Sequence, residues 1–295
     1  MEEMLAHVST VILPVLLCAL AGFALARCDV RFDKKTVGAI VANVGYPALV
    51  IGHLSKAHVA LDAFLDMLLA AFAVVVCYGV IGFGIVKAMR LPVRGYVTPM
   101  MLTNVGNVGL PVCALAFGAE GLAYAMAFVV VMLVGAFTVG MWLPMGRITA
   151  TDILKKPVIY AVVVALVMLG NHVSLPAPVA RTFDYLGALA IPLMLLTLGH
   201  TLATLKTAVL WRGFYLAVLH LLMAGAVAYV LADAFDFSGT ARGVFILQCL
   251  MPVSVVTFLW VETYDPDDGP AVAGFILVST LLAMAVLPLA LTFWI

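Results

Sequence analysis

The residues best placed to do chemistry form a short polar segment within an apolar stretch. The segment LTNVGNVGLP, from Leu102 to Pro111, holds Asn104, Asn107 and Gly109. Two glycines and a proline so close together predict an interrupted helix, because proline removes a backbone donor and clashes with the preceding turn. The asparagines add neutral hydrogen-bond donors beside the interruption. The segment therefore indicates a binding site.

A second segment, QCLMPVS from Gln248 to Ser254, repeats this arrangement. We expect both Pro111 and Pro252 to be the first residue of a new half-helix, where a backbone N–H is not needed. The amides that would then point into the gap are those of Val112 and Cys113 in the first segment and of Val253 and Ser254 in the second.

Two half-helix N-termini that meet create positive potential without a formal charge. A small anion, most naturally a carboxylate, suits such a site, with Asn104, Asn107 and Gln248 as additional donors. Asn43, in an earlier apolar run, is expected to face the same site. The alternative is that the kinks serve only the packing of the helices.

These segments must be positioned by helices that lie in a membrane. Of the 295 residues, 65% are hydrophobic and 10% are charged, whereas a soluble protein has about half and about a quarter. Fifteen basic residues balance fifteen acidic ones, so the charge gives no indication of a nucleic-acid partner. The composition predicts an all-α polytopic membrane protein with the lipid bilayer as its solvent.

Ten apolar runs are long enough, at about 20 residues, to suggest spanning helices. They lie at Met4–Arg27, Val37–Leu54, Leu61–Met89, Gly95–Phe117, Leu122–Met145, Pro157–Val173, Val179–Leu202, Val209–Leu231, Ala241–Val261 and Ala271–Ile295. Twelve of the fifteen lysines and arginines fall in alternate loops, and the other loops hold only Lys56, Arg181 and Arg242. Both termini should therefore face away from the cytoplasm.

The chain also contains an internal repeat that its prolines mark. Pro14 and Pro157, Pro47 and Pro192, Pro111 and Pro252, and Pro144 and Pro288 are separated by 143, 145, 141 and 144 residues. Five spans per repeat is an odd number, so the second repeat would enter the membrane in the opposite sense. Residues 1–148 and 149–295 are thus expected to form two inverted five-helix repeats, the pattern of secondary transporters.

The motifs now resemble those of the auxin efflux carrier family. The segment TNVGNVGLPVCALAFG, with Asn104, Gly109, Pro111 and Gly118, resembles the family's fourth-helix pattern. QCLMP resembles the ninth-helix pattern, and PLMLLTLGHTLA resembles the end of the seventh helix. A bile-acid/sodium symporter has a similar inverted-repeat architecture.

The resemblance implies an elevator-type mechanism for small organic anions, with the site where spans four and nine cross. Spans one, two, six and seven would form a scaffold and a homodimer contact, while spans three to five and eight to ten would move. The loop from Gly146 to Lys156 is short. It therefore favours a compact bacterial member, in an inner (plasma) membrane, over a plant-type carrier.

Three ionisable residues are candidates for proton coupling. Asp66 lies in the third predicted span, and His53 and His200 follow the matched prolines Pro47 and Pro192. An ionisable group within a span is a functional candidate, and histidine titrates near neutral pH. The alternative is a hydrated position at the membrane interface for Asp66 and interfacial hydrogen bonding for the two histidines. We expect no metal and no other cofactor, with H⁺ or Na⁺ as the possible coupling ion.

Other functions have weaker support in the sequence. A sodium-coupled bile-acid-type symporter needs acidic or further polar ligands beside the ninth-span break, where the sequence offers only Gln248. A sodium/proton antiporter needs aspartates at the crossing. No motif of an intramembrane enzyme is present, so we expect no enzymatic activity. A membrane sensor that binds without transporting fits the sequence as well.

Overall fold

The computed structural model describes residues 2–54, 60–146, 157–171, 173–204, 210–265 and 267–292. Every regular element within these ranges is a helix, apart from one isolated bridge between two extended segments. The all-α prediction is therefore confirmed for the described part of the chain. Most of the predicted loop from Gly146 to Lys156 lies outside it.

The helices follow one another with short connections. In the first half they are α1 (Glu2–Arg27), α2 (Lys34–Ile40), η1 (Val41–Gly45), α3 (Tyr46–Leu54), α4 (Leu61–Ala88), α5 (Val93–Met101), η2 (Val105–Gly109), α6 (Leu110–Gly135), η3 (Ala136–Gly140) and α7 (Met141–Met145), where η marks a π-helical turn. In the second half they are α9 (Pro157–Gly170), α10 (Ala177–Ala188), α11 (Ala190–Thr204), α12 (Leu210–Ala234), α13 (Gly239–Cys249), α14 (Val255–Tyr264) and α15 (Gly269–Leu291).

Five of the described helical segments are long and apolar enough to cross a membrane. They are Leu61–Ala88, Val105–Gly135, Ala177–Thr204, Leu210–Ala234 and Gly269–Leu291. Three shorter apolar helices, Leu16–Arg27, Thr36–Gly52 and Pro157–Gly170, add to them. The chain is thus a multi-pass membrane protein, while the total of ten spans stays a prediction.

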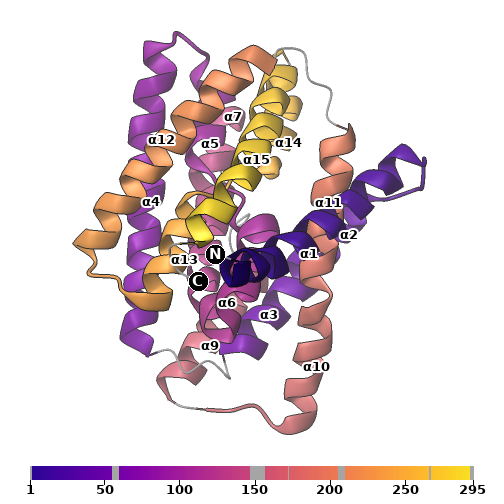
Figure 1. The fold of residues 1–295 in the computed structure, drawn as a ribbon, viewed down its shortest axis with the longest axis vertical. Helices are drawn as coiled ribbons and strands as arrows, with labels where there is room; N and C mark the ends of the chain where they lie inside the picture. Colours follow the sequence, from indigo (N-terminus) through magenta and orange to yellow (C-terminus); the bar gives the residue numbers. More distant parts are fainter. Residues whose placement is uncertain are drawn as a thin grey trace.

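The helices pack as two groups that meet along one side (Figure 1). On one side α1 packs against α11, and α3 packs against α9 and α10. On the other side α4 packs against α6 and α12, and α12 packs against α15. The two groups touch where α1 and α3 meet α6 and where α11 meets η2. This boundary runs beside the interrupted helices.

Small residues allow the closest of these contacts, between α1 and α11. Gly22 lies against the backbone of Leu196, and Gly199 lies against the backbone of Ala19. A side chain at Gly199 would fall 2.6 Å from the carbonyl carbon of Ala19, too close for any real contact. In a bilayer, such close backbone approach supplies van der Waals contact that lipid cannot replace.

Gly118 divides α6 into two segments without a separate loop. Its φ of 62° and ψ of −145° are not helical, and glycine is the residue that adopts them without strain. Residues 110–117 and 119–135 therefore belong to two helices, which correspond to the fourth and fifth predicted spans. A side chain at Gly118 would meet open space, so its backbone conformation is what requires glycine.

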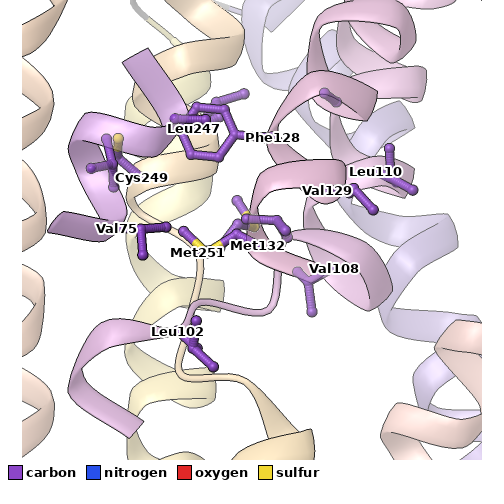
Figure 2. Close-up of a cluster of buried hydrophobic side chains, with 14 of the residues drawn as sticks. Val75, Leu102, Val108, Leu110, Phe128, Val129, Met132, Leu247, Cys249 and Met251 are labelled. Atoms are coloured by element: carbon purple, nitrogen blue, oxygen red, sulfur yellow. The ribbon is translucent and has the colours of Figure 1, made fainter. Parts of the chain in front are cut away.

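A dense apolar core surrounds the interruptions in the chain (Figure 2). Leu102, Phe128 and Met251 are at most 1% exposed. Val75, Val108, Leu110, Val129, Met132, Leu247 and Cys249 fill the space around them. Because this packing excludes water, every polar group inside it must find a partner within the protein or in a ligand.

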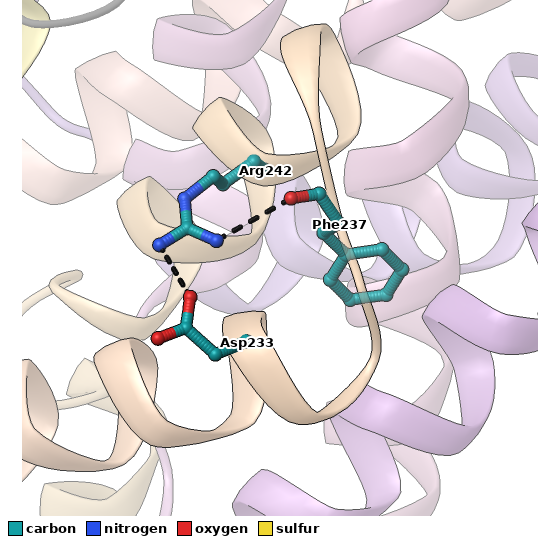
Figure 3. A network of polar contacts seen from close by, with 3 residues as sticks. All are labelled: Asp233, Phe237 and Arg242. Carbon is teal, nitrogen blue, oxygen red and sulfur yellow. Dashed lines mark hydrogen bonds and ion pairs between the residues drawn. The ribbon is translucent and has the colours of Figure 1, made fainter.

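A polar contact fixes the turn that leads into α13 (Figure 3). Arg242 forms an ion pair with Asp233 at 2.7 Å and donates a 3.4 Å hydrogen bond to the carbonyl oxygen of Phe237. Arg242 is one of three basic residues in the loops that we expect to face away from the cytoplasm, and its partner Asp233 lies at the end of the preceding helix. Its role is therefore to hold the end of α12 against the start of α13.

Candidate functional site

Both predicted helix interruptions are present. α5 ends at Met101, residues 102–104 are not helical, and the helix resumes at Val105. α13 ends at Cys249, residues 250–254 are not helical, and α14 begins at Val255. Leu102 and Ser254 are extended, with ψ of 120° and 126°. Each interruption thus lies within the segment that we expected to hold it, although the residues of the first one, Leu102 to Asn104, precede its glycines and its proline.

The two breaks cross and join through their backbones. Thr103 and Val253 form an antiparallel bridge. The amide of Asn104 donates to the Pro252 carbonyl at 2.7 Å, and the amide of Ser254 donates to the Leu102 carbonyl at 2.9 Å. Backbone groups in lipid must be satisfied within the protein, so the interruptions stabilise each other.

In the first segment the half-helix does not begin at Pro111, where we predicted its start. The helix resumes at Val105, and the amides of Val108 and Gly109 donate to the Asn104 carbonyl at 3.2 and 3.3 Å. Pro111 lies just after the π-helical turn η2, within a continuous helix, and its missing N–H is accommodated where the wider turn gives way to an α-helix. The amides of Val112 and Cys113 are therefore not at a free helix end.

The second segment also corrects the prediction. Pro252 lies in the extended connection and does not begin α14. The amide of Val253 donates to the Ser279 hydroxyl at 3.2 Å, and the amide of Ser254 is used by Leu102. Both amides that we expected to face a ligand are bound within the protein, because the crossing satisfies its own backbone.

Side chains at the crossing remain without partners. Both amide atoms of Gln248, the Nδ2 of Asn104 and the Oγ1 of Thr103 are buried and make no hydrogen bond to any described residue. Gln248 is 0% exposed, and its amide lies directly over Gly109. Leaving such a group unpaired costs roughly 1–3 kcal/mol, so the cluster is poised to bind a polar ligand.

The more accessible side of the crossing carries two further polar residues. Asn107, one of the predicted site residues, is half-buried in η2. The hydroxyl of Tyr46, at the start of α3, lies over Gly106 and fills the place of a side chain there. The sequence interpretation passed over Tyr46 and Thr103. For Tyr46 the available signal was its position immediately before Pro47, one of the matched prolines.

Asn43 does not join the crossing. It is exposed, and its side-chain nitrogen donates to the Ala39 carbonyl of the preceding turn at 2.8 Å. The π-helical turn η1 spans this position, and its wider turn changes the direction in which the following side chains point. In the state described here Asn43 therefore bonds within its own helix, and its contribution to the site stays a prediction.

The proton-coupling candidates lie near helix ends. Asp66 is exposed in the second turn of α4. His200 is buried near the end of α11, and its ring stacks on Phe32 at 4.9 Å. The side chain of His53 lies outside the described residues. No residue of 102–109 or 248–254 is charged, and no cluster in the described part of the chain has three metal-ligating side chains.

Comparison with known proteins gives a consistent picture. A family model described as membrane transport protein matches residues 141–294, which is 154 of the 295 residues. An uncharacterized transporter of Methanocaldococcus jannaschii is 25% identical over 300 residues, covering 95% of this chain and 96% of the relative. An uncharacterized transporter of Methanothermobacter thermautotrophicus is 28% identical over 305 residues, covering 94% and 95%.

Proposed function

Because the chain belongs to the membrane transport protein family, which includes the auxin efflux carriers, we propose that this transporter carries small organic anions and binds them where its interrupted helices cross. The observation that carries the proposal is the unpaired amide of Gln248, fully buried beside two crossed helix breaks.

The chemistry of the crossing favours an anion, and a carboxylate in particular. The amides of Val105, Gly106 and Asn107 begin a long helix, and those of Val255 and Val256 begin α14, so both helix dipoles place positive potential at the breaks. Asn104 and Gln248 supply neutral donors that reach the same region. A carboxylate would thus be held without a lysine or an arginine.

The helix contacts support the inverted repeat of residues 1–148 and 149–295. The first helix of the first repeat, α1, packs on α11 of the second repeat. The first helix of the second repeat, α9, packs on α3 of the first repeat in the same way. Within the first repeat α4 packs on α6, and within the second α12 packs on α15. Each contact has its counterpart, as two structurally related halves require.

The same contacts support an elevator-type mechanism. A stationary group (α1–α3 and α9–α11) would form the scaffold and a homodimer contact, and a mobile group (α4–α7 and α12–α15) would carry the crossing. Within the groups, α1 packs along α11 and α12 packs along α15, whereas the two groups meet mainly where α1 and α3 reach α6 and where α11 reaches η2 (Figure 1). Coupling would use H⁺ or Na⁺, or the substrate gradient alone.

Transport assays with two variants test the site. Purified protein in liposomes is assayed for counterflow of radiolabelled acetate, lactate, pyruvate, malonate and succinate. Asn104→Ala and Gln248→Ala are each expected to lower the rate about tenfold or more, because a hydrogen bond to a charged group contributes about 1.5–3 kcal/mol. Both variants should still fold, which heat-unfolding curves check.

Asn171→Ala is the matched control, because Asn171 is exposed directly after α9 and, within the described part of the chain, bonds to the Val167 carbonyl alone. It should transport as the wild type does. Normal transport by both site variants would place the site elsewhere. Binding of a carboxylate without counterflow by the wild type would instead identify a sensor, and sodium-dependent counterflow would favour the bile-acid-type symporter.

A further inference from the structure

The Tyr46 hydroxyl belongs to one group of helices and touches the other. Tyr46 begins α3 of the stationary group and is 9% exposed. Gly106 lies in η2, directly after the break that the mobile group carries. A side chain at Gly106 would collide with the hydroxyl and would lie 3.4 Å from the ring carbon that bears it. The phenol therefore rests on the backbone of the crossing.

This hydroxyl has no partner inside the described part of the chain, where no residue forms a hydrogen bond with it. Gly106 belongs to the first turn of its helix, in which the amides of Val105, Gly106 and Asn107 have no acceptor within the helix, because the first intrahelical bonds run from Val108 and Gly109. A phenol and three amides thus present several donors and no charge at one place. An anion bound there would receive hydrogen bonds from both groups of helices.

The second repeat carries no equivalent of this hydroxyl. Pro47 and Pro192 are matched residues, so the counterpart of Tyr46 is Ile191, immediately before Pro192. Ile191 is half-buried and has no hydrogen-bonding group in its side chain. When the two repeats exchange conformations, the residue that approaches the crossing from the stationary group would be apolar.

We infer that Tyr46 is a recognition residue that binds the carried anion in only one of the two transport states, so that the site has unequal affinity on the two sides of the membrane. The inference rests on the proposed function and adds to it a source of directionality. The mobile group contributes Gln248 and Asn104 in both states. The stationary group contributes a donor in the state described here and an isoleucine in the other.

The test measures KM from each side of the membrane separately. Right-side-out and inside-out vesicles are assayed with the same five radiolabelled carboxylates, for the wild type and for Tyr46→Phe. The variant should raise KM about tenfold on the side where the wild type binds more tightly, and should leave KM on the other side within about twofold. Since the hydroxyl has no partner in the free protein, its loss should not shift the unfolding midpoint.

Two further variants separate recognition from general damage. Tyr185→Phe removes the same atom from an exposed tyrosine of α10, also in the stationary group, and should leave both KM values unchanged. Gly106→Ala, introduced alone, should raise KM on the side of the membrane where the wild type binds more tightly, because the added methyl group displaces the Tyr46 hydroxyl. In the Tyr46→Phe background it should add little, since the clash with the oxygen is gone.

The outcomes of these assays distinguish the role of Tyr46 from the proposed transport of carboxylates. Absence of flux for all five carboxylates in the wild type would overturn the proposed function. Clear wild-type flux with equal KM changes on both sides, or with no change, would overturn the role of Tyr46 and leave carboxylate transport intact. A one-sided change in the Tyr46→Phe variant together with an unchanged Tyr185→Phe variant supports the inference.

Discussion

Replacing Gly109 with alanine tests directly where the Gln248 amide lies. Gly109 is buried in η2, and an added Cβ would lie 2.8 Å from the Cδ atom of Gln248 and 3.1 Å from its Nε2 atom. The amide is the flexible end of its side chain. Because Gln248 is 0% exposed, however, the amide cannot move out into solvent.

The magnitude follows from two opposing effects. Overpacking a filled interior costs about 1–3 kcal/mol, whereas replacing a helical glycine with alanine gains about 0.5–1 kcal/mol. A net loss of roughly 1–2 kcal/mol in the free energy of unfolding is expected for Gly109→Ala. Carboxylate affinity should fall further, by about 10- to 100-fold, because the displaced amide no longer donates to the ligand.

Heat unfolding in detergent and equilibrium binding of the five carboxylates measure the two effects. Gly225→Ala is the control, because a side chain at Gly225, within α12, meets nothing within 4 Å. It should be neutral or slightly stabilising and should bind normally. In the Gln248→Ala background, Gly109→Ala should cost much less, since the clash is removed. Full affinity in the Gly109→Ala protein would refute this placement of Gln248.

Two further predictions concern the hydrogen bond of Tyr78 beside Gln248 and the carboxyl group of Asp268 at the start of α15. Tyr78 donates a 2.9 Å hydrogen bond to the buried Cys249 carbonyl, directly after Gln248, so Tyr78→Phe should lower the free energy of unfolding by about 1–3 kcal/mol and weaken carboxylate binding in a titration. Burial, with the charge of Asp265 as a smaller cause, raises the pKa of Asp268 above its ordinary value. The folded protein then holds this proton at a higher pH than the unfolded chain, and stability falls as pH rises above the ordinary carboxyl pKa. Asp268→Asn should remove that fall in unfolding midpoints measured across the acidic range; an unchanged pH profile would exclude Asp268 as its source.

The positions of the helix breaks could be predicted because they depend on local chemistry. Glycine and proline in LTNVGNVGLP, and proline in QCLMPVS, disfavour a continuous helix whatever surrounds them. The amide of Gln248 was recognisable for a similar reason, since a polar side chain within an apolar run needs a partner. These inferences required no knowledge of which segments meet in space.

The details that could not be predicted depend on contacts between distant segments. The bridge between Thr103 and Val253 joins residues far apart in sequence, and it uses the amide of Ser254, which local reasoning left free for a ligand. The π-helical turns had a similar effect. They place Pro111 inside a helix and include Asn43, which bonds to the Ala39 carbonyl, and nothing in the residue types marks a wider turn.

The self-pairing of the crossing changes which groups can select a substrate. Two of the amides expected to face a ligand, those of Val253 and Ser254, are already bound within the protein, so they hold the two breaks together and cannot distinguish one anion from another. Selectivity must then come from the groups that remain unpaired, above all the Gln248 amide and the Asn104 side chain. Side chains change readily by mutation, whereas a backbone bridge does not. If the crossing is the site that we propose, a fixed backbone with exchangeable donors around it would keep one transport mechanism while it accommodates different substrates.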